Sequence, residues 1–418
     1  MRLILSLILL SSLHSFAQKE YAIGVMDTLC SPHFDGRGYV NQGDVRAADF
    51  IVEELERIGV QPFKDKSYTQ DYSFNVNTFP YDLEVILGED TLVPGADYLV
   101  SPISGTAQGD FDVVEINKTN FFTTYGGNIN FKLIDASQTI FAFNFLDAKN
   151  KDLKKKISAL TYEATKYFPV ISVTNQKQMY SVGRKQSTYP LITIDSAAYS
   201  QVSTASIKVN NKFIMGYESK NVIGLIPGKK KKKYVVFSAH YDHLGRMGTD
   251  TYFPGANDNA SGVAMLLSLA KHYMLHKPKY SIVFCFFSGE EAGLLGSKHF
   301  VSHPYFPLKK VKFVLNIDIM GGASDGITVV NGTKHEKEYA RMVDINEEHQ
   351  LITQVKKRGP TANSDHYFFS EMGVPAFFIY SMGSVKNYHD IYDKAENTPL
   401  NKFDQVQKLM ELFVQEIK

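Results

Sequence analysis

The chain has 418 residues, a length at which one large domain accompanied by a smaller one is the natural expectation. Its 45 lysines and arginines almost balance its 44 aspartates and glutamates, for a formal net charge of +1 at pH 7, so no global field would collect nucleic acid or anionic lipid. A hydrophobic share of 44% and a charged share of 21% are ordinary for a globular protein and argue against extensive disorder.

The first 17 residues have the pattern of a secretory signal. Met1 and Arg2 precede an apolar run over residues 3–10, and a Ser-rich stretch then leads to a plausible cleavage site after Ala17. The run is far shorter than the roughly 20 residues that span a bilayer. We therefore expect a protein exported to the periplasm or the extracellular space, without a stable membrane anchor.

A helix and a β-rich segment follow the leader. Residues 45–59 predict an amphipathic helix that ends at Gly59, with apolar side chains at Ala47, Phe50, Ile51, Leu55 and Ile58. From about residue 67 to residue 215, short stretches rich in Tyr, Phe, Val, Ile and Thr alternate with Gly, Asn, Asp and Ser, except in a charged patch at residues 147–156. We divide the mature chain into an N-terminal segment of the main domain (18–80), a β-rich insert (81–215) and the rest of the main domain (216–418).

From Asn221 onward strongly apolar strands alternate with helices. The predicted elements are a strand at 234–238, a helix at 262–275 and strands at 280–287, 311–320 and 374–380. Such alternation predicts an α/β domain whose sheet is covered by helices on both faces. Cys285 lies inside one of these strands, where a buried free thiol is expected in preference to a disulfide with Cys30.

Polar residues follow the first two of these strands. His240 and Asp242 come directly after the strand at 234–238, where a ligand-binding crevice forms in such sheets. The pair suits a metal ligand and a carboxylate that orients it, although a buried structural histidine is an equal alternative. We interpret His243 as structural. Glu290 and Glu291 follow the strand at 280–287, where adjacent carboxylates repel each other unless a cation or proton compensates.

Three further acidic or imidazole side chains lie in comparable positions. Asp258 precedes the predicted helix at 262–275, so it is either an N-cap or a carboxylate that bridges two metals. Asp318 ends an apolar strand and needs a partner there, and His389 lies in a loop after the strand at 376–380. Five such elements around one sheet, each offering the O or N atoms that zinc prefers, predict a metal site.

The ordered set His240-x-Asp242, Asp258, Glu290-Glu291, Asp318 and His389 resembles the co-catalytic dizinc exopeptidases typified by bacterial leucyl aminopeptidase, aminopeptidase Y and glutamate carboxypeptidase II. Family-like motifs cover about residues 219–398, and residues 35–38 resemble the family's N-terminal approach. The resemblance implies a three-layer αβα zinc-exopeptidase (phosphorylase/hydrolase-like) catalytic domain with a mixed, mostly parallel central sheet. It also implies that the β-rich insert occupies the place of a protease-associated domain, although its own sequence matches that domain poorly.

Roles for the site residues follow from the same resemblance. Asp258 is expected to bridge two zinc ions, with His240 and Asp318 completing one site and Glu291 and His389 the other. Glu290 is expected to be the general base for a water shared by the ions, and Asp242 to orient His240. Tyr388 resembles a tyrosine that stabilises the oxyanion, and Asp365, in a segment resembling the family's active-site floor, is a candidate support or substrate-amine group.

The implied function is that of an exported metallo-aminopeptidase acting on peptides with a free N-terminus. A glutaminyl cyclase, which uses one zinc and acyl transfer, is the first alternative, but that family places tryptophan around its substrate and this sequence has none. A carboxypeptidase would be expected to offer an arginine cluster, and only Arg246 and Arg358 lie near recognisable motifs. An inactive receptor of the same fold would have lost ligands, and all of them are present.

Overall fold

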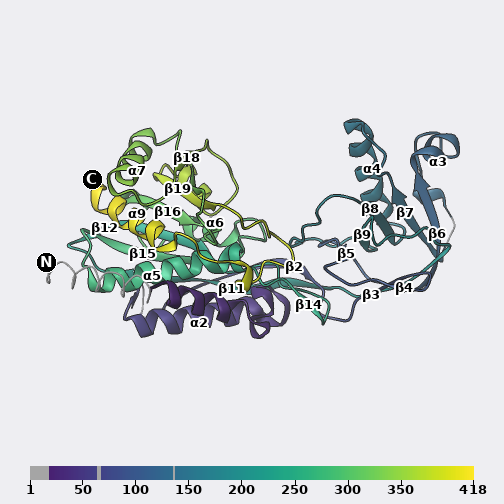
Figure 1. The fold of residues 1–418 in the computed structure, drawn as a ribbon. Helices are drawn as coiled ribbons and strands as arrows, with labels where there is room; N and C mark the ends of the chain where they lie inside the picture. Colours follow the sequence, from purple (N-terminus) through teal and green to yellow (C-terminus); the bar gives the residue numbers. More distant parts are fainter. Residues whose placement is uncertain (1–17, 64–66, 135–136) are drawn as a thin grey trace.

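The computed structural model describes residues 18–63, 67–134 and 137–418, so the predicted leader lies outside the described residues. Figure 1 shows two lobes, one on the left with both chain ends and one on the right formed by a single inserted stretch. A nine-stranded sheet organises the first lobe, here called the catalytic lobe, and an eight-stranded sheet organises the second, here called the insert.

The sheet of the catalytic lobe is mixed, with a parallel centre. Its order is β1-β11-β15-β12-β16-β19-β17-β18, and β2 also pairs with β11. Strands β12, β15, β16 and β19 are parallel, whereas β11 pairs antiparallel with β15 and β17 pairs antiparallel with β19 and parallel with β18. The bounds are β1 Gln61–Pro62, β2 Thr69–Thr78, β11 Lys212–Ile226, β12 Lys230–His240, β15 Tyr280–Phe287, β16 Val311–Ile317, β17 Gly326–Val330, β18 Val355–Lys357 and β19 Ala376–Met382.

Helices cover both faces of this sheet because the central strands are apolar on both sides. Along β15, Ile282 and Phe284 face a core shared with α2, α5, α7 and α9, whereas Val283 and Cys285 face a core shared with α6 and α8. The helix bounds are α2 Gly43–Ile58, α5 Ser261–Leu275, α6 Leu295–Ser302, α7 Glu336–His349, α8 His366–Glu371 and α9 Phe403–Glu416. The predicted three-layer αβα architecture with a mixed sheet is confirmed.

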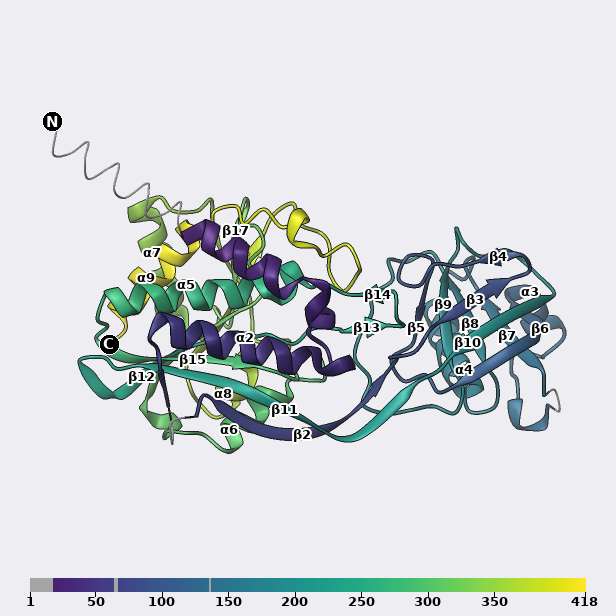
Figure 2. The same ribbon diagram turned by 90° about the horizontal axis from the view of Figure 1, so that it is seen from below.

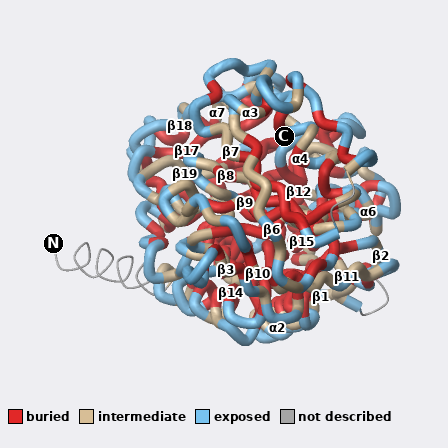
Figure 3. Tube along the Cα trace, turned by 90° about the vertical axis from the view of Figure 1, so that its right-hand side faces the viewer, coloured by how far each residue is buried: buried red, intermediate tan, exposed pale blue. Residues whose placement is uncertain are grey.

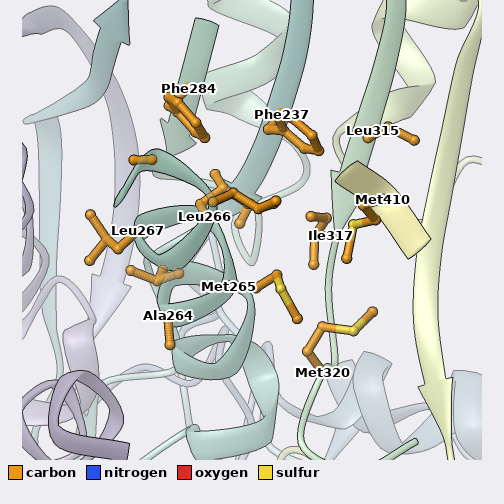
Figure 4. Packing of buried hydrophobic residues seen from close by; sticks show 14 of the residues in the cluster. Phe237, Ala264, Met265, Leu266, Leu267, Phe284, Leu315, Ile317, Met320 and Met410 are labelled. Carbon is orange, nitrogen blue, oxygen red and sulfur yellow. The ribbon is translucent and has the colours of Figure 1, made fainter. Parts of the chain in front are cut away.

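Helix α5 is the most deeply buried of these helices. Residues 261–270 are all buried, which agrees with their nearly uninterrupted apolar sequence. Figure 4 shows Met265 and Leu266 of α5 directed toward Phe237 of β12 and Ile317 of β16. Helix α5 is therefore packed against the centre of the sheet.

The insert contains parallel strands and helices as well as the β-rich elements that its sequence predicts. Its strand order is β4-β3-β10-β6-β7-β8-β9-β5, and β6 to β9 are parallel neighbours. The charged patch at 147–156 leads into α4, which buries Ile157, Thr161 and Ala164. The bounds are β3 Glu84–Leu87, β4 Asp90–Thr91, β5 Tyr98–Val100, β6 Ala107–Asn117, α3 Lys118–Thr123, β7 Thr139–Asn144, α4 Lys151–Ala164, β8 Val170–Thr174, β9 Leu191–Asp195 and β10 Thr204–Val209.

The two lobes are joined by a two-stranded ribbon and by a shared apolar core. Strands β2 and β11 run from the catalytic lobe to the insert (Figure 2), and Thr78 pairs with Lys212 where they reach it. A hairpin of the catalytic lobe, formed by β13 (Arg246–Met247) and β14 (Thr251–Tyr252), reaches the insert from the other side. Met247 and the neighbouring Phe253 belong to the hydrophobic core of the insert.

Several local expectations can be compared with the structure. Helix α2 covers the predicted residues 45–58, and Gly59 ends it with a φ of 88°. The strand predicted at 311–320 ends earlier, at Ile317, because the chain turns at Ile319, whose φ is +58°.

Cys30 and Cys285 are both free and buried. Burial follows the layers, with central strands such as β15 buried and the outer surfaces of the molecule exposed (Figure 3). Among the described residues, no helix is long and apolar enough to cross a membrane.

Candidate metal centre

The carboxyl ends of the parallel strands bring the predicted site residues together. His240 ends β12, Glu290 and Glu291 follow β15, and Asp318 follows β16. Because these strands are parallel neighbours, their side chains meet at one edge of the sheet. Asp258 reaches the same edge from the loop before α5.

The two oxygens of the Asp258 carboxylate face different imidazoles. Its Oδ1 lies 3.2 Å from Nε2 of His240, and its Oδ2 lies 3.1 Å from Nε2 of His389. On the first side, His240 Nε2 is also 3.4 Å from Oδ1 of Asp318. On the second side, His389 Nε2 is 3.4 Å from Oε2 of Glu291. The five predicted ligands thus form two groups that share Asp258.

Asp258 does not cap the helix that follows it. Helix α5 begins at Ser261, and Ala260 occupies its N-cap position without a side-chain cap. The neighbouring Asn259 donates to the carbonyl of Ile317 over 3.1 Å and accepts from the N–H of Ile319 over 3.2 Å. These bonds fasten the loop of Asp258 to the loop that carries Asp318.

His243, which we interpreted as structural, lies beside one of the predicted ligands. Its Nδ1 is 2.9 Å from Oε1 of Glu291, and the ring is fully buried. His243, Asp258 and Glu291 offer ligand atoms close enough together for one ion, as do His240, Asp258 and Asp318. Sequence reasoning missed this contact, although the spacing of three residues from His240 in one loop was a usable signal.

Charges in the centre strongly perturb the histidines and Asp258. Burial alone would lower the pKa of His240, but the charges of Asp318 and Glu290 raise it well above its usual value. Burial likewise opposes protonation of His389, yet the charge of Glu291 and the contact with Asp258 raise its pKa to about 9. Burial would raise the pKa of Asp258, but hydrogen bonds from the two histidines hold it well below its ordinary range.

The remaining carboxyl groups retain protons more strongly than usual. Burial raises the pKa of Glu291 to about 8, against the opposing charge of His389. The pKa of Glu290 also rises well above its usual value, through burial and the nearby charges of Asp365, Glu291 and Asp318, although His240 opposes them. Together with the raised pKa values of His240 and His389, these shifts mean that this group of carboxylates favours added positive charge.

The residues present fit a divalent metal such as zinc. Asp318 Oδ1 is buried and accepts no hydrogen bond from the described part of the chain, although it points at His240. Imidazole nitrogens and carboxylate oxygens are donors that zinc takes in catalytic sites. A cation in each of the two groups would supply the positive charge that the pKa shifts favour. The carboxylate of Asp258 would be a ligand in both groups.

Asp242 contacts His240 mainly through its main chain. The carbonyl of Asp242 lies 3.0 Å from His240 Nδ1, and its carboxylate oxygen lies 3.7 Å away. The carboxylate accepts the N–H groups of Glu290 and Glu291, each over 3.2 Å, and the hydroxyl of Tyr39 over 2.6 Å. Asp242 therefore fixes both the ring of His240 and the turn that carries the two glutamates, and Tyr39 is a supporting residue that sequence reasoning missed.

Asp393 and Arg37, whose roles were not predicted from the sequence, hold the loop that carries Asp258. The carboxylate of Asp393 accepts the N–H groups of Asn257 and Asp258 over 2.8 and 3.0 Å. Arg37 is fully buried and donates to the carbonyls of Pro254 and Gly255 over 2.6 and 2.7 Å. The segment around Arg37 resembles the N-terminal part of the family's catalytic domain, but the sequence did not indicate which groups the Arg37 side chain contacts.

Tyr388 and Asp365 differ in how accessible they are. The ring of Tyr388 stacks on that of His389 with centroids 3.9 Å apart, and 38% of the residue is exposed. Asp365 is 0% exposed, and burial raises its pKa to about 7. The carboxylate is therefore closed to solvent in this structure, and the two roles considered for Asp365, support of the centre and contact with a substrate amine, stay predictions.

The three-layer domain thus carries an imidazole–carboxylate centre at the carboxyl ends of its parallel strands. Residues 221–414 match the model of peptidase family M28, so this part of the chain is similar to that family.

Individual relatives agree with this assignment. The chain is 28% identical over 232 residues to aminopeptidase YwaD of Bacillus subtilis, a match that covers 53% of this chain and 49% of the relative. It is 26% identical over 189 residues to a vacuolar membrane protease of Candida glabrata, covering 44% of this chain and 19% of that protein. The chain thus spans about half the length, or less, of these curated relatives.

Two solved structures are similar over nearly the whole chain, insert included. BSAP, a zinc aminopeptidase from Bacillus subtilis, has a TM-score of 0.68 and 19% identity, covering 95% of this chain and 94% of that one. A peptidase M28 precursor from Shewanella amazonensis has a TM-score of 0.68 and 16% identity, covering 97% of each chain. At these identities the similarity establishes the fold.

Proposed function

We propose that the protein is an exported metallo-aminopeptidase that hydrolyses the N-terminal residue of peptides with two zinc ions. The observation that carries the proposal is that one carboxylate oxygen of Asp258 faces His240 and the other faces His389. The names of the relatives, an aminopeptidase and a zinc aminopeptidase, support the choice of reaction, and the leader pattern at residues 1–17 supports export.

Five side chains would hold the ions. His240 and Asp318 would serve one, Glu291 and His389 the other, and Asp258 both. When bound, the two ions would lower the pKa of a water molecule toward neutrality and polarise the scissile carbonyl.

Glu290 is the proposed general base. It follows β15 directly and lies among the charges of His240, Asp318 and Glu291, but it is not needed as a ligand. The bond from its N–H to Asp242 fixes the main chain at this point. Its carboxylate would take a proton from the attacking water and return it to the leaving amine, and bound cations would keep the carboxylate ionised by lowering its pKa.

Tyr388 is the proposed donor to the developing oxyanion. Burial and the surrounding carboxylates raise the pKa of its hydroxyl far above its usual value, so the hydroxyl keeps its proton. The stacking on His389 holds the ring at the accessible side of the centre. A neutral hydroxyl there would stabilise negative charge on the substrate carbonyl oxygen in the transition state.

Preference for a free N-terminus would come from the excess of carboxylates in the centre. Glu290, Glu291, Asp258 and Asp318 lie close together, and a substrate ammonium group would be attracted to this negative field.

The test is a matched pair of peptides, one with a free N-terminus and one acetylated, incubated with the zinc-loaded protein and followed by mass spectrometry. We expect stepwise removal of N-terminal residues from the free peptide only. Release of C-terminal residues from the acetylated peptide would refute the aminopeptidase assignment and favour a carboxypeptidase. Cyclisation of an N-terminal glutamine without hydrolysis would instead favour the cyclase alternative.

A further inference from the structure

Tyr180, a residue of the insert, contacts the predicted ligand His389 at two points. Tyr180 lies in the segment between β8 and β9. Its carbonyl lies 3.0 Å from Nδ1 of His389, and its N–H donates to the carbonyl of His389 over 2.9 Å. The insert thus contacts both the ring and the main chain of a side chain that projects into the centre.

His389 needs such support because of its backbone conformation. Its φ is +54°, in the left-handed region that residues with a Cβ adopt at a cost. The residue also lies in a loop after β19, outside any helix or strand. The two bonds to Tyr180 hold this conformation and direct Nε2, the nitrogen opposite the bonded Nδ1, toward Asp258 and Glu291.

A neighbouring lysine of the insert reinforces the same loop. Lys177 Nζ lies 2.7 Å from the carboxylate of Asp390 and donates to the carbonyl of Lys386 over 3.0 Å. Asp390 in turn accepts the N–H of Tyr392 over 2.9 Å. The residue after His389 is therefore fixed by a contact from the insert as well.

Tyr180 is itself fixed against the loop that leads to Asp258. Its ring stacks on Phe253 with centroids 4.6 Å apart and planes inclined by 7°. Both rings are buried and belong to the core of the insert, and Phe253 lies two residues before Gly255, whose carbonyl accepts a hydrogen bond from Arg37. One insert residue thus touches the segments that carry two of the five ligands.

We infer that the insert is a working part of the metal centre, with Tyr180 as the positioning residue that sets the ring of His389. A ligating histidine usually donates its other ring N–H to a carboxylate, carbonyl or water, and loss of such a partner typically lowers metal affinity about 10- to 100-fold. Here the partner is a carbonyl supplied by the other lobe. The part of the inference that concerns metal rests on the proposed dizinc function, whereas the hold on the imidazole does not.

Four variants of the full chain test the inference. Tyr180→Ala removes the ring that stacks on Phe253 and so frees the segment that carries the carbonyl. Tyr180→Phe keeps the stack and is the matched conservative control. Lys177→Ala removes the ion pair with Asp390, and Lys132→Ala is its control, because Lys132 is an exposed lysine of the insert.

Two readouts separate the hold on His389 from the metal function. The first is the Nδ1–H signal of His389 in ¹⁵N-histidine NMR spectra of the metal-free protein, assigned by its absence in His389→Gln. We expect a protected signal in the parent and in Tyr180→Phe, and an exchange-broadened signal in Tyr180→Ala. The second is zinc retained per chain during dialysis against increasing chelator, where Tyr180→Ala should lose one ion at about tenfold lower chelator concentration.

The outcomes are distinct. An unchanged Nδ1–H signal in folded Tyr180→Ala, together with zinc retention equal to the parent, overturns the inference. A loss of equal size in Tyr180→Phe would also overturn it, because the stack is intact in that variant. If the NMR result holds but the parent never retains two ions, the dizinc function is wrong and the positioning by Tyr180 stands. Lys177→Ala should give a smaller loss than Tyr180→Ala, and Lys132→Ala none.

Discussion

Replacing Glu290 by glutamine should remove most of the activity and leave the metal centre in place. Glutamine has nearly the same shape as glutamate, and the N–H of residue 290 would still donate to Asp242, because that bond is made by the main chain. The five proposed ligands are unchanged. The substitution therefore removes the proton acceptor and little else.

The size of the loss follows from the step that is removed. A positioned general base contributes about 10²–10⁴-fold to a rate, or about 3–5 kcal/mol at about 1.4 kcal/mol for each factor of ten. We expect kcat/KM of Glu290→Gln to fall by this amount. Because no bond to the metal or to Asp242 is lost, the zinc content and the thermal unfolding temperature should remain close to those of the parent.

The assay combines hydrolysis of an aminoacyl-arylamide with elemental analysis of the same samples. Glu291→Gln is the matched control, since it alters the neighbouring carboxylate that contacts His389 and His243 and should lower the zinc content. Near-parental turnover by Glu290→Gln with two ions bound would refute the assignment of the base. Loss of zinc from Glu290→Gln, with zinc retained in Glu291→Gln, would show that the two carboxylates have exchanged roles. A parent that binds a single ion tightly would contradict the dizinc proposal itself.

Two other predictions concern the buried residues Arg37 and Asp44. Arg37→Met should destabilise the protein by more than about 3 kcal/mol in urea unfolding, because several buried carbonyls lose their donor at about 1–3 kcal/mol each; a change below about 1 kcal/mol would contradict this. Burial raises the pKa of Asp44 to about 7 from 3.8, so the folded state holds a proton that the unfolded state releases. Stability should therefore fall as pH rises from about 4 to about 7, by at most about 1.4 kcal/mol per unit. Asp44→Asn should flatten this slope in unfolding series at several pH values, and an unaltered slope would refute the assignment.

The fold of the catalytic lobe and the proximity of the five proposed ligands were predictable because each of these residues follows a strongly apolar strand or precedes an apolar helix. His240 and Asp318 stand at the ends of runs that read as buried strands, and parallel strands place such ends together. The choice between N-cap and bridging ligand for Asp258 was not available from the sequence, because both roles suit an aspartate before a helix. It required the positions of His240 and His389.

The supporting contacts were not predictable, for a different physical reason. Tyr39 reaches Asp242 across 203 positions of sequence, and the carbonyl of Tyr180 reaches His389 across 209. A main-chain carbonyl carries no trace in the residue type, so the second contact has no sequence signal at all. The parallel strands of the insert were missed for a related reason, since short apolar stretches do not reveal the direction in which their partners run.

Thr78 pairs with Lys212 at the base of the insert. We therefore expect the sheet of the insert to fold before the rest of the catalytic lobe. All strands of its sheet lie between residues 84 and 209, so the sheet can form from one contiguous stretch, and Met247 and Phe253 then complete its hydrophobic core. Once folded, it holds the ends of β2 and β11 side by side and removes the entropy penalty of closing a very long loop. The pairing of β2 with β11, whose residues are far apart in the sequence, then needs no long loop to be closed. The sheet of the catalytic lobe can extend from this pair of strands.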